Sequence, residues 1–407
     1  MKKISGGVTA PKGFKASGVH CGLRKNKTKK DLALIVSDVL CDAAAVYTTN
    51  LVKGAPIAVT QDTLKNHKAQ AIVCNSGIAN TCAPDGIEKA TIMAEETAKT
   101  LGISKDDIIV ASTGVIGPSL NINAIISGLP EAKDCLDAGS TASNSAAHAI
   151  MTTDTIVKKV AISFLIGDKE VRIGGIAKGS GMICPNMATM LSFLTTDANI
   201  DGEILQKALS ECIADTFNMV SVDGDTSTND MVSVMASGLA GNTRITDVSS
   251  SEYKAFKNNL LFACKNLAMK VASDGEGATK LIECNVKDAP DINTAKVCAK
   301  SVIKSPLVKT AMFGADANWG RVLCALGYAG VPLNVEKIDV DFVSDAGTIP
   351  VCRGGHGVAF SEEKAKIILS EDVVIIDVCL NNGESSATAW GCDLTYDYVK
   401  INGDYRT

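Results

Sequence analysis

Short apolar runs bounded by turn residues recur along the chain and predict its strands. The predicted strands lie at residues 32–36, 69–74, 107–110, 231–237, 281–286, 337–343, 367–369, 373–380 and 395–400. The apolar runs 160–166 and 171–173 flank a polar turn, which predicts a hairpin over residues 157–174. Another apolar strand is expected directly after residue 189, and both the first 85 and the last 70 residues are expected to form strands.

Other segments carry apolar residues at every third or fourth position, which is typical of helices packed on one face. The predicted helices lie at residues 87–101, 138–151, 202–218, 251–271 and 294–310. The first of them is expected to stop at Gly102. Strands and helices alternate in groups, so we expect an α/β protein of the α+β type, with layered sheets packed by helices.

Length and composition narrow the class of protein. A chain of 407 residues has room for two or three domains or one large composite fold. Hydrophobic residues make up 46% and charged residues 21%, which is the range of ordinary globular proteins. Lys and Arg total 40 against 45 Asp and Glu, for a net charge of -5, and aromatic residues are only 4%. Nucleic acid is therefore not expected as the main partner.

The cysteines and the N-terminal segment point to a reducing compartment. The two lysines after Met1 are not followed by an apolar segment, so no secretory signal is expected, and no apolar stretch is long enough for a membrane helix. None of the 14 cysteines forms a Cys-x-x-Cys pair, and there are only four histidines. We expect reduced, mostly buried thiols in a cytoplasmic protein, with no metal or other cofactor.

Residues 174–191 combine four glycines, Lys178 and Pro185 with the start of an apolar strand. Glycine-rich loops can cradle phosphate, but the Walker order is absent because Lys178 precedes Gly179 and Gly181. A dinucleotide fingerprint is absent as well. Residue types alone favour a tight turn that leads into a buried strand.

A second interpretation of the same segment starts from the hydroxyl of Thr189. A hydroxyl is a weak nucleophile without a base, and four histidines leave little room for a Ser-His-Asp triad. Cutting the chain before Thr189 would free an α-amine with a pKa of about 8, which suits it to be that base. Ala188 is small, and the stiff χ1 of Thr189 can aim its hydroxyl at the preceding carbonyl. Both interpretations remain open from the residues alone.

Several long motifs in one order resemble the ornithine acetyltransferase family, the glutamate N-acetyltransferases of the cyclic arginine pathway. The resemblance covers essentially the whole chain. The motifs that carry it are STGVIG (112–117), MTTDT (151–155), KGSGMI (178–183) with Pro185 and MATML (187–191), SDGEGATK (273–280), DANWGR (316–321) and INGDYRT (401–407).

The resemblance implies a fold like that of DmpA and the ornithine acetyltransferases, and a precursor that cuts itself between Ala188 and Thr189. The products would be an α chain, 1–188, and a β chain, 189–407, which stay together, usually as an α2β2 assembly in the cytoplasm. Thr189 would be the nucleophile. Thr113 and Gly114 would form the oxyanion hole.

The resemblance also implies the reaction and its substrate contacts. An acetyl group would move from N2-acetyl-L-ornithine to L-glutamate through an acetyl-Thr189 ester, and acetyl-CoA is a possible second donor. The implied substrate-binding residues are Thr152, Lys178, Thr189, Glu276, Asn402 and Thr407. Lys178 would attract a substrate carboxylate, while Glu276 would pair with the δ-amine of ornithine or move a proton.

Alternatives remain for the function and for single residues. An N-terminal-nucleophile aminopeptidase or amidase would use the same Thr189 with water as acceptor, and an uncut binding protein would bury it. Without the resemblance, Lys178 would be a solvated lysine and Glu276 a loop carboxylate. The acidic run 223–230 lacks the spacing and closing glutamate of an EF-hand, so it is interpreted as a polar turn or active-site segment.

Overall fold

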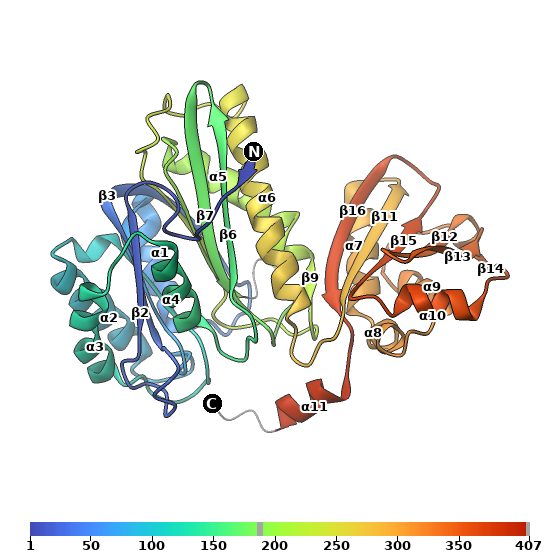
Figure 1. Ribbon diagram of the computed structural model, residues 1–407, viewed down its shortest axis with the longest axis horizontal. Coiled ribbons are helices and arrows are strands. Elements are labelled where there is room, and N and C mark those ends of the chain that lie inside the picture. The colour runs from blue at the N-terminus through green and yellow to red at the C-terminus, as the bar shows by residue number, and fades with distance from the viewer. Residues whose placement is uncertain (185–189, 404–407) are drawn as a thin grey trace.

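Two β-sheets form the framework of the protein. The computed structural model describes residues 1–184 and 190–403. Figure 1 shows the sheets side by side, with the long helix α6 (Ser251–Ser273) standing between them and packing on strands of both. The prediction of an α/β protein with sheets layered against helices is confirmed.

The first sheet holds nine strands within the described residues, in the order β1-β6-β7-β8-β10-β3-β4-β5, with β2 paired to β3. They are β1 (Lys2–Lys3), β2 (Phe14–Val19), β3 (Leu32–Tyr47), β4 (Lys68–Asn75), β5 (Ile108–Ser112), β6 (Lys158–Ile166), β7 (Lys169–Lys178), β8 (Leu191–Thr196) and β10 (Met231–Ala236). The predicted hairpin is β6–β7. At the end of β7, Lys178 lies opposite Leu191 of β8, so the segment that joins these strands begins and ends at one end of the sheet.

Helices cover both faces of the first sheet, which explains why its central strands β8 and β10 are buried at every position. Ala44 and Val46 of β3 belong to a core cluster with α5 (Gly202–Ala214) and α6. Their neighbours Ala43 and Ala45 point the other way, into a cluster with α4 (Ser140–Ile150). The remaining helices of this part are α1 (Ala55–Thr63), α2 (Gly86–Leu101) and α3 (Ile122–Asp134), with short 3₁₀ turns at Leu64–Asn66, Lys105–Asp107 and Phe217–Met219.

The second sheet runs in the order β14-β13-β12-β15-β11-β16-β9. Its strands are β9 (Val220–Ser221), β11 (Leu281–Ala289), β12 (Asp339–Ser344), β13 (Gly347–Arg353), β14 (His356–Gly357), β15 (Val373–Cys379) and β16 (Ser385–Cys392). The helices of this part are α7 (Ile292–Lys304), α8 (Pro306–Phe313), α9 (Trp319–Gly327), α10 (Glu362–Leu369) and α11 (Tyr396–Gly403), with a 3₁₀ turn at Val335–Lys337. In Figure 1, α11 leaves this unit and lies below α6, towards the first sheet.

The helix predicted at 294–310 is two helices. α7 ends at Lys304, and Ser305 is extended with φ -66° and ψ 115°. A proline disfavours the helical conformation of the residue before it, and Pro306 then occupies the first turn of α8, where a missing N–H costs little. The side chain of Ser305 accepts the N–H of Val308 and caps the second helix.

Two predicted strands are helices, and one helix lies where only strands were expected. Residues 367–369 end α10, whose start is capped by the side chain of Ser361. Residues 395–400 fall mostly in α11, and their apolar–polar alternation does not mark a strand because Tyr396 is 85% exposed. Pro56 stands in the first turn of α1. Short apolar runs cannot by themselves separate a strand from a turn of helix.

The cysteines are mostly buried and unpaired, as expected from the sequence. All 14 cysteines are free, and nine of them are buried. No helix within residues 1–184 and 190–403 has both the length and the apolar character needed to cross a membrane.

Candidate active site

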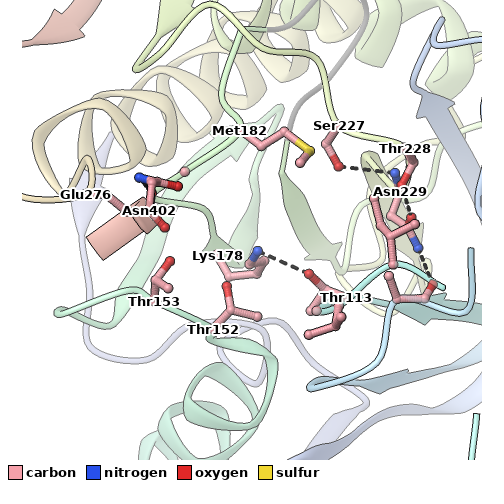
Figure 2. A pocket seen from close by; sticks show the side chains of 15 residues that line it. Thr113, Thr152, Thr153, Lys178, Met182, Ser227, Thr228, Asn229, Glu276 and Asn402 are labelled. Carbon is pink, nitrogen blue, oxygen red and sulfur yellow. Dashed lines mark hydrogen bonds between the residues drawn. The ribbon is translucent and has the colours of Figure 1, made fainter. Parts of the chain in front are cut away.

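A cavity of about 290 Å³ lies at the ends of β5 and β7 of the first sheet and is also lined by the loop after α6 and by α11. It is lined by Ala79, Thr113, Gly114, Val115, Ile116, Thr152, Thr153, Lys178, Gly181, Met182, Ser227, Thr228, Asn229, Glu276 and Asn402. Figure 2 shows polar side chains from distant parts of the sequence projecting into this common space. The cavity is large enough for an amino-acid derivative.

All six site residues that the sequence indicated outside positions 188–189 and 407 line this cavity. They are Thr113, Gly114, Thr152, Lys178, Glu276 and Asn402. Ala188, Thr189 and Thr407 lie outside the described residues. The structure thus brings the six together, while the role of each stays a prediction.

Thr113 and Lys178 are joined directly. The Nζ of Lys178 donates a hydrogen bond to the Oγ1 of Thr113, with 3.2 Å between them. An ammonium group has donors only, so the threonine oxygen must act as the acceptor. The hydroxyl proton of Thr113 therefore remains available to a third group in the cavity.

Gly114 needs to be glycine for two reasons. Its φ is +128°, which disfavours any side chain, and an added Cβ would lie only 2.3 Å from the carbonyl carbon of Gly77. The N–H groups of Thr113 and Val115 on either side bond to backbone oxygens of Asn75 and Gly77. The N–H of Gly114 has no acceptor within residues 1–184 and 190–403, so it is a free donor at the cavity wall.

Lys178 is buried, with 9% of its surface exposed, so the interpretation of a solvated lysine is wrong. No carboxylate in the described part of the chain lies within ion-pair distance of its Nζ. Burial lowers the pKa of Lys178, and the more distant charges of Asp154 and Asp230 oppose that change. The cavity therefore holds a cation whose charge is not matched by a direct ionic partner.

Glu276 lies in the loop between α6 and β11, as expected, but its side chain is buried, at 7% exposure. It projects into the same cavity as Lys178 (Figure 2). Its Oε2 accepts a hydrogen bond of 2.7 Å from the Nδ2 of Asn402 in α11. An added Cβ on Gly181 would lie 2.3 Å from this carboxylate. A glycine at 181 is thus required for Glu276 to reach the cavity.

A buried ion cluster beneath the cavity fixes three of its walls. Lys158 is fully buried, and its Nζ lies 2.6 Å from Asp154 Oδ1 and 2.5 Å from Asp274 Oδ2. Asp154 also accepts the N–H groups of Thr152, at 3.0 Å, and Gly179, at 2.7 Å. These bonds hold the segments that carry Thr152 and Lys178.

The same cluster reaches the Glu276 side of the cavity. Asp274 lies two residues before Glu276 and accepts the backbone N–H and the hydroxyl of Thr155. The positive charges of Lys158 and Lys178 and the Gly179 N–H hold the pKa of Asp154 down at about 2 against the opposing effect of burial. The sequence did not single out this cluster, because Asp274 lies 116 residues after Lys158.

Asn229 organises the opposite wall, and the sequence did not single it out either. Its Nδ2 donates to the carbonyls of Ala79, at 2.6 Å, and Ser112, at 3.0 Å, and so anchors the residue before Thr113. Its Oδ1 accepts the hydroxyls of Thr81 and Thr228. The only sequence signal was the polar run 223–230.

Part of the polar run 223–230 lines the cavity, while its role in the active site stays a prediction. Asp223 accepts the backbone N–H groups of Met182, at 2.6 Å, and Ile183, at 2.9 Å, and holds the glycine-rich loop. Asp230 is buried beside a second cavity of about 20 Å³, and burial raises the pKa of its carboxyl. Within the described residues, no three His, Cys, Asp or Glu side chains are placed to hold a metal ion.

Comparison with known proteins gives consistent results. The sequence model of the ArgJ family matches residues 15–407. The arginine biosynthesis bifunctional protein ArgJ 1 of Clostridium acetobutylicum is 51% identical over 395 residues, which cover 97% of this chain and 96% of that protein. ArgJ of Caldanaerobacter subterraneus subsp. tengcongensis is 49% identical over 408 residues, with full coverage of both chains.

A solved structure gives a related match. A crystal structure of the arginine biosynthesis bifunctional protein argJ from Bacillus halodurans is 51% identical and superposes with a TM-score of 0.51. The match covers all of that chain but 53% of this one.

Proposed function

This chain belongs to the ArgJ family, and on that premise we propose that it moves an acetyl group from N2-acetyl-L-ornithine to L-glutamate through an ester on Thr189. Membership confirms the family resemblance of the sequence and makes the chain an acetyltransferase of arginine biosynthesis. The observation that carries the proposal is the convergence of Thr113, Gly114, Lys178 and Glu276 on one cavity.

The proposal includes a cut between Ala188 and Thr189. A cut there leaves a fragment of 219 residues, or 54% of the 407. The crystallised Bacillus halodurans chain corresponds to 53% of this chain although it is matched along its whole length, and a relative divided near the same position would give such a chain. The two fragments would remain associated as an α2β2 assembly in the cytoplasm.

The first half-reaction uses donors that are free in the cavity. The α-amine of Thr189 takes the proton of its own Oγ, which attacks the acetyl carbon. The N–H of Gly114 and the hydroxyl of Thr113 stabilise the resulting oxyanion, since both lack another acceptor in the described residues. The C–N bond breaks, the α-ammonium returns the proton to the leaving nitrogen, and ornithine departs.

The second half-reaction repeats these steps in reverse with glutamate. The amine of glutamate attacks the acetyl-Thr189 ester, its proton passes to the α-amine of Thr189, and the C–O bond breaks as Oγ recovers a proton. Lys178 attracts the α-carboxylate of either substrate, because its charge has no ionic partner at close range. Glu276 pairs with the δ-ammonium of ornithine, which is present only in the first half-reaction.

Two measurements test the proposal. Denaturing electrophoresis of the purified protein should give fragments of 188 and 219 residues, and Thr189→Ala should remain one chain without transferase activity. With N2-acetyl-L-ornithine as donor, N-acetylglutamate should form only when glutamate is present, and free acetate should not accumulate without it. Acetate released at the same rate with or without glutamate would establish a hydrolase instead, and full transfer by Thr189→Ala would refute the nucleophile.

A further inference from the structure

The second cavity, of about 20 Å³, adjoins the candidate active site. Thr113, Lys178 and Ser227 line both cavities, and Asp230 faces the second one. A buried water needs roughly 10–15 Å³ of such space and about two to four polar partners. The second cavity therefore has room for one water, and the polar groups in its walls decide whether a water binds there.

Asp230 supplies an acceptor to this space. The residue is 2% exposed, and its Oδ2 makes no hydrogen bond with any residue in 1–184 or 190–403. Its main chain is fixed, because its carbonyl accepts the N–H of Thr48 and the next residue, Met231, is the first of β10. A buried carboxyl oxygen without a partner costs free energy, so a donor bound in the cavity would stabilise the protein at this point.

Lys178 supplies a donor. An ammonium group has three N–H bonds, and one of them points to the Oγ1 of Thr113. Lys178 and Asp230 both lie in the described part of the chain and form no direct ion pair, although the charge of each acts on the other. Polar groups that face each other beyond hydrogen-bond distance are often joined by a water. The ammonium and the carboxyl group can therefore hold one water between them, as donor and acceptor.

Burial works against the charge of both groups. It raises the pKa of Asp230 and lowers the pKa of Lys178, and the charge of each group opposes the shift of the other. A hydrogen bond with the Ser227 side chain also works against the raised pKa of Asp230. The other titratable groups around Lys178 are Asp154, Lys158, Cys74 of β4 and Glu276, which lines the active-site cavity. Asp230 is thus a carboxylate that, together with Asp154, favours the charged form of Lys178.

We propose that the second cavity binds one water, which accepts an N–H of Lys178 and donates to the carboxylate of Asp230, and that Asp230 acts through this water as a positioning residue for Lys178. Ser227 lines the same cavity, and its hydroxyl is a third partner for the water. The inference rests on the proposed function, because Lys178 needs its charge to attract the carboxylate of the substrate. Asp230 itself touches no substrate in this arrangement.

The pH profile of turnover tests the role of Asp230. Asp230→Asn keeps the size of the side chain and can still bind the water, but it removes a charge that helps to keep Lys178 protonated. The pKa of Lys178 should then fall further. The high-pH limb of kcat/KM for N2-acetyl-L-ornithine should therefore move to lower pH by about one unit, the effect of an opposite charge a few ångströms away. A purely structural role would reduce stability or turnover without moving this limb.

Asp168→Asn is the matched control. It removes the same charge from an exposed turn directly before β7, at the end of the strand opposite to Lys178. Salt screens an interaction between charges over the length of this strand almost completely. The high-pH limb should therefore stay in place in Asp168→Asn.

A high-resolution crystal structure of the wild-type protein supplies a readout that does not depend on activity. It should show one ordered water at about 2.7–3.2 Å from both the Nζ of Lys178 and the carboxyl group of Asp230. A cavity without this water would overturn the inference, even if Asp230→Asn fails to fold. A high-pH limb that stays in place in Asp230→Asn, with or without an equal loss of turnover at every pH, would overturn the role of Asp230. A wild-type protein without transferase activity would overturn the proposed function instead, whatever the crystal structure shows at the second cavity.

Discussion

Lys158 and Lys178 are buried lysines on neighbouring strands, and they lie in opposite electrostatic surroundings. Lys158 of β6 pairs in register with Ala177, the residue before Lys178 in β7. The ammonium of Lys158 contacts two carboxylates at 2.5 and 2.6 Å, whereas the ammonium of Lys178 contacts one hydroxyl at 3.2 Å. Lys158 therefore has direct carboxylate partners, whereas Lys178 has no carboxylate in direct contact among residues 1–184 and 190–403.

This difference indicates that Lys158 supports the fold and that Lys178 serves the candidate active site. A buried charge with well-placed partners fixes geometry, and removing one partner leaves the others uncompensated. A buried charge without a direct ionic partner carries a desolvation cost in the free protein, as the lowered pKa of Lys178 reflects. An anionic substrate that pairs with Lys178 offsets this desolvation cost when it binds. We therefore expect Lys158 to matter for stability and Lys178 for turnover.

The largest effect is expected from Lys158→Met. This change leaves Asp154 and Asp274 buried without their common cation, so the free energy of unfolding should fall by about 3–5 kcal/mol. Chemical denaturation measures it. The variant Lys158→Met/Asp154→Asn/Asp274→Asn should recover part of the loss, because no charge is then stranded. If Lys158→Met were as stable as the wild-type protein, Lys158 would not be needed to stabilise the fold.

Lys178→Met should have the opposite profile. We expect kcat/KM to fall on the order of 10²–10³-fold, since the variant loses both the substrate cation and the partner that orients the Thr113 hydroxyl. The free energy of unfolding should not fall, because Met removes an unmatched buried charge. Steady-state kinetics and denaturation on the same preparation test this. A large loss of stability with little loss of turnover would reverse the roles assigned to the two lysines.

The site around Lys178 could be predicted from the sequence, whereas the ion cluster around Lys158 could not. Thr113, Gly114, Lys178 and Glu276 belong to continuous motifs, so their meeting at one cavity could be expected before the structure. The contacts of Lys158 with Asp154 and Asp274 could not be predicted in this way, because Asp274 is brought to Lys158 by the packing of α6 against β6. Sheet layering was predictable from apolar runs. The helix at 395–400 was not, since its alternating pattern fits a strand as well as an exposed turn of helix.

Lowering the pH tests the contribution of the Asp154 carboxylate to the ion cluster of Lys158, Asp154 and Asp274. The pKa of Asp154 is lowered from 3.8 to about 2, so its contribution to stability is present above pH 3.8 and is lost as the pH falls through about 2. The shift corresponds to about 2 kcal/mol. Comparing the free energy of unfolding of the wild-type protein and Asp154→Asn from pH 5 to pH 2 should show the steeper decline in the wild-type protein. Equal slopes would mean that the pKa of Asp154 is not lowered in the folded protein.

Lys159→Met should have the smallest effect and is the matched control for Lys158→Met. Residue 159 follows Lys158 on β6, and successive side chains of a strand point to opposite faces. Its Nζ contacts only the Oδ1 of Asn144, at 3.5 Å, and makes no ion pair in the described ranges 1–184 and 190–403. The free energy of unfolding should change by less than about 0.5 kcal/mol. If Lys159→Met were as destabilising as Lys158→Met, methionine on β6 and not the loss of a shared cation would explain both results.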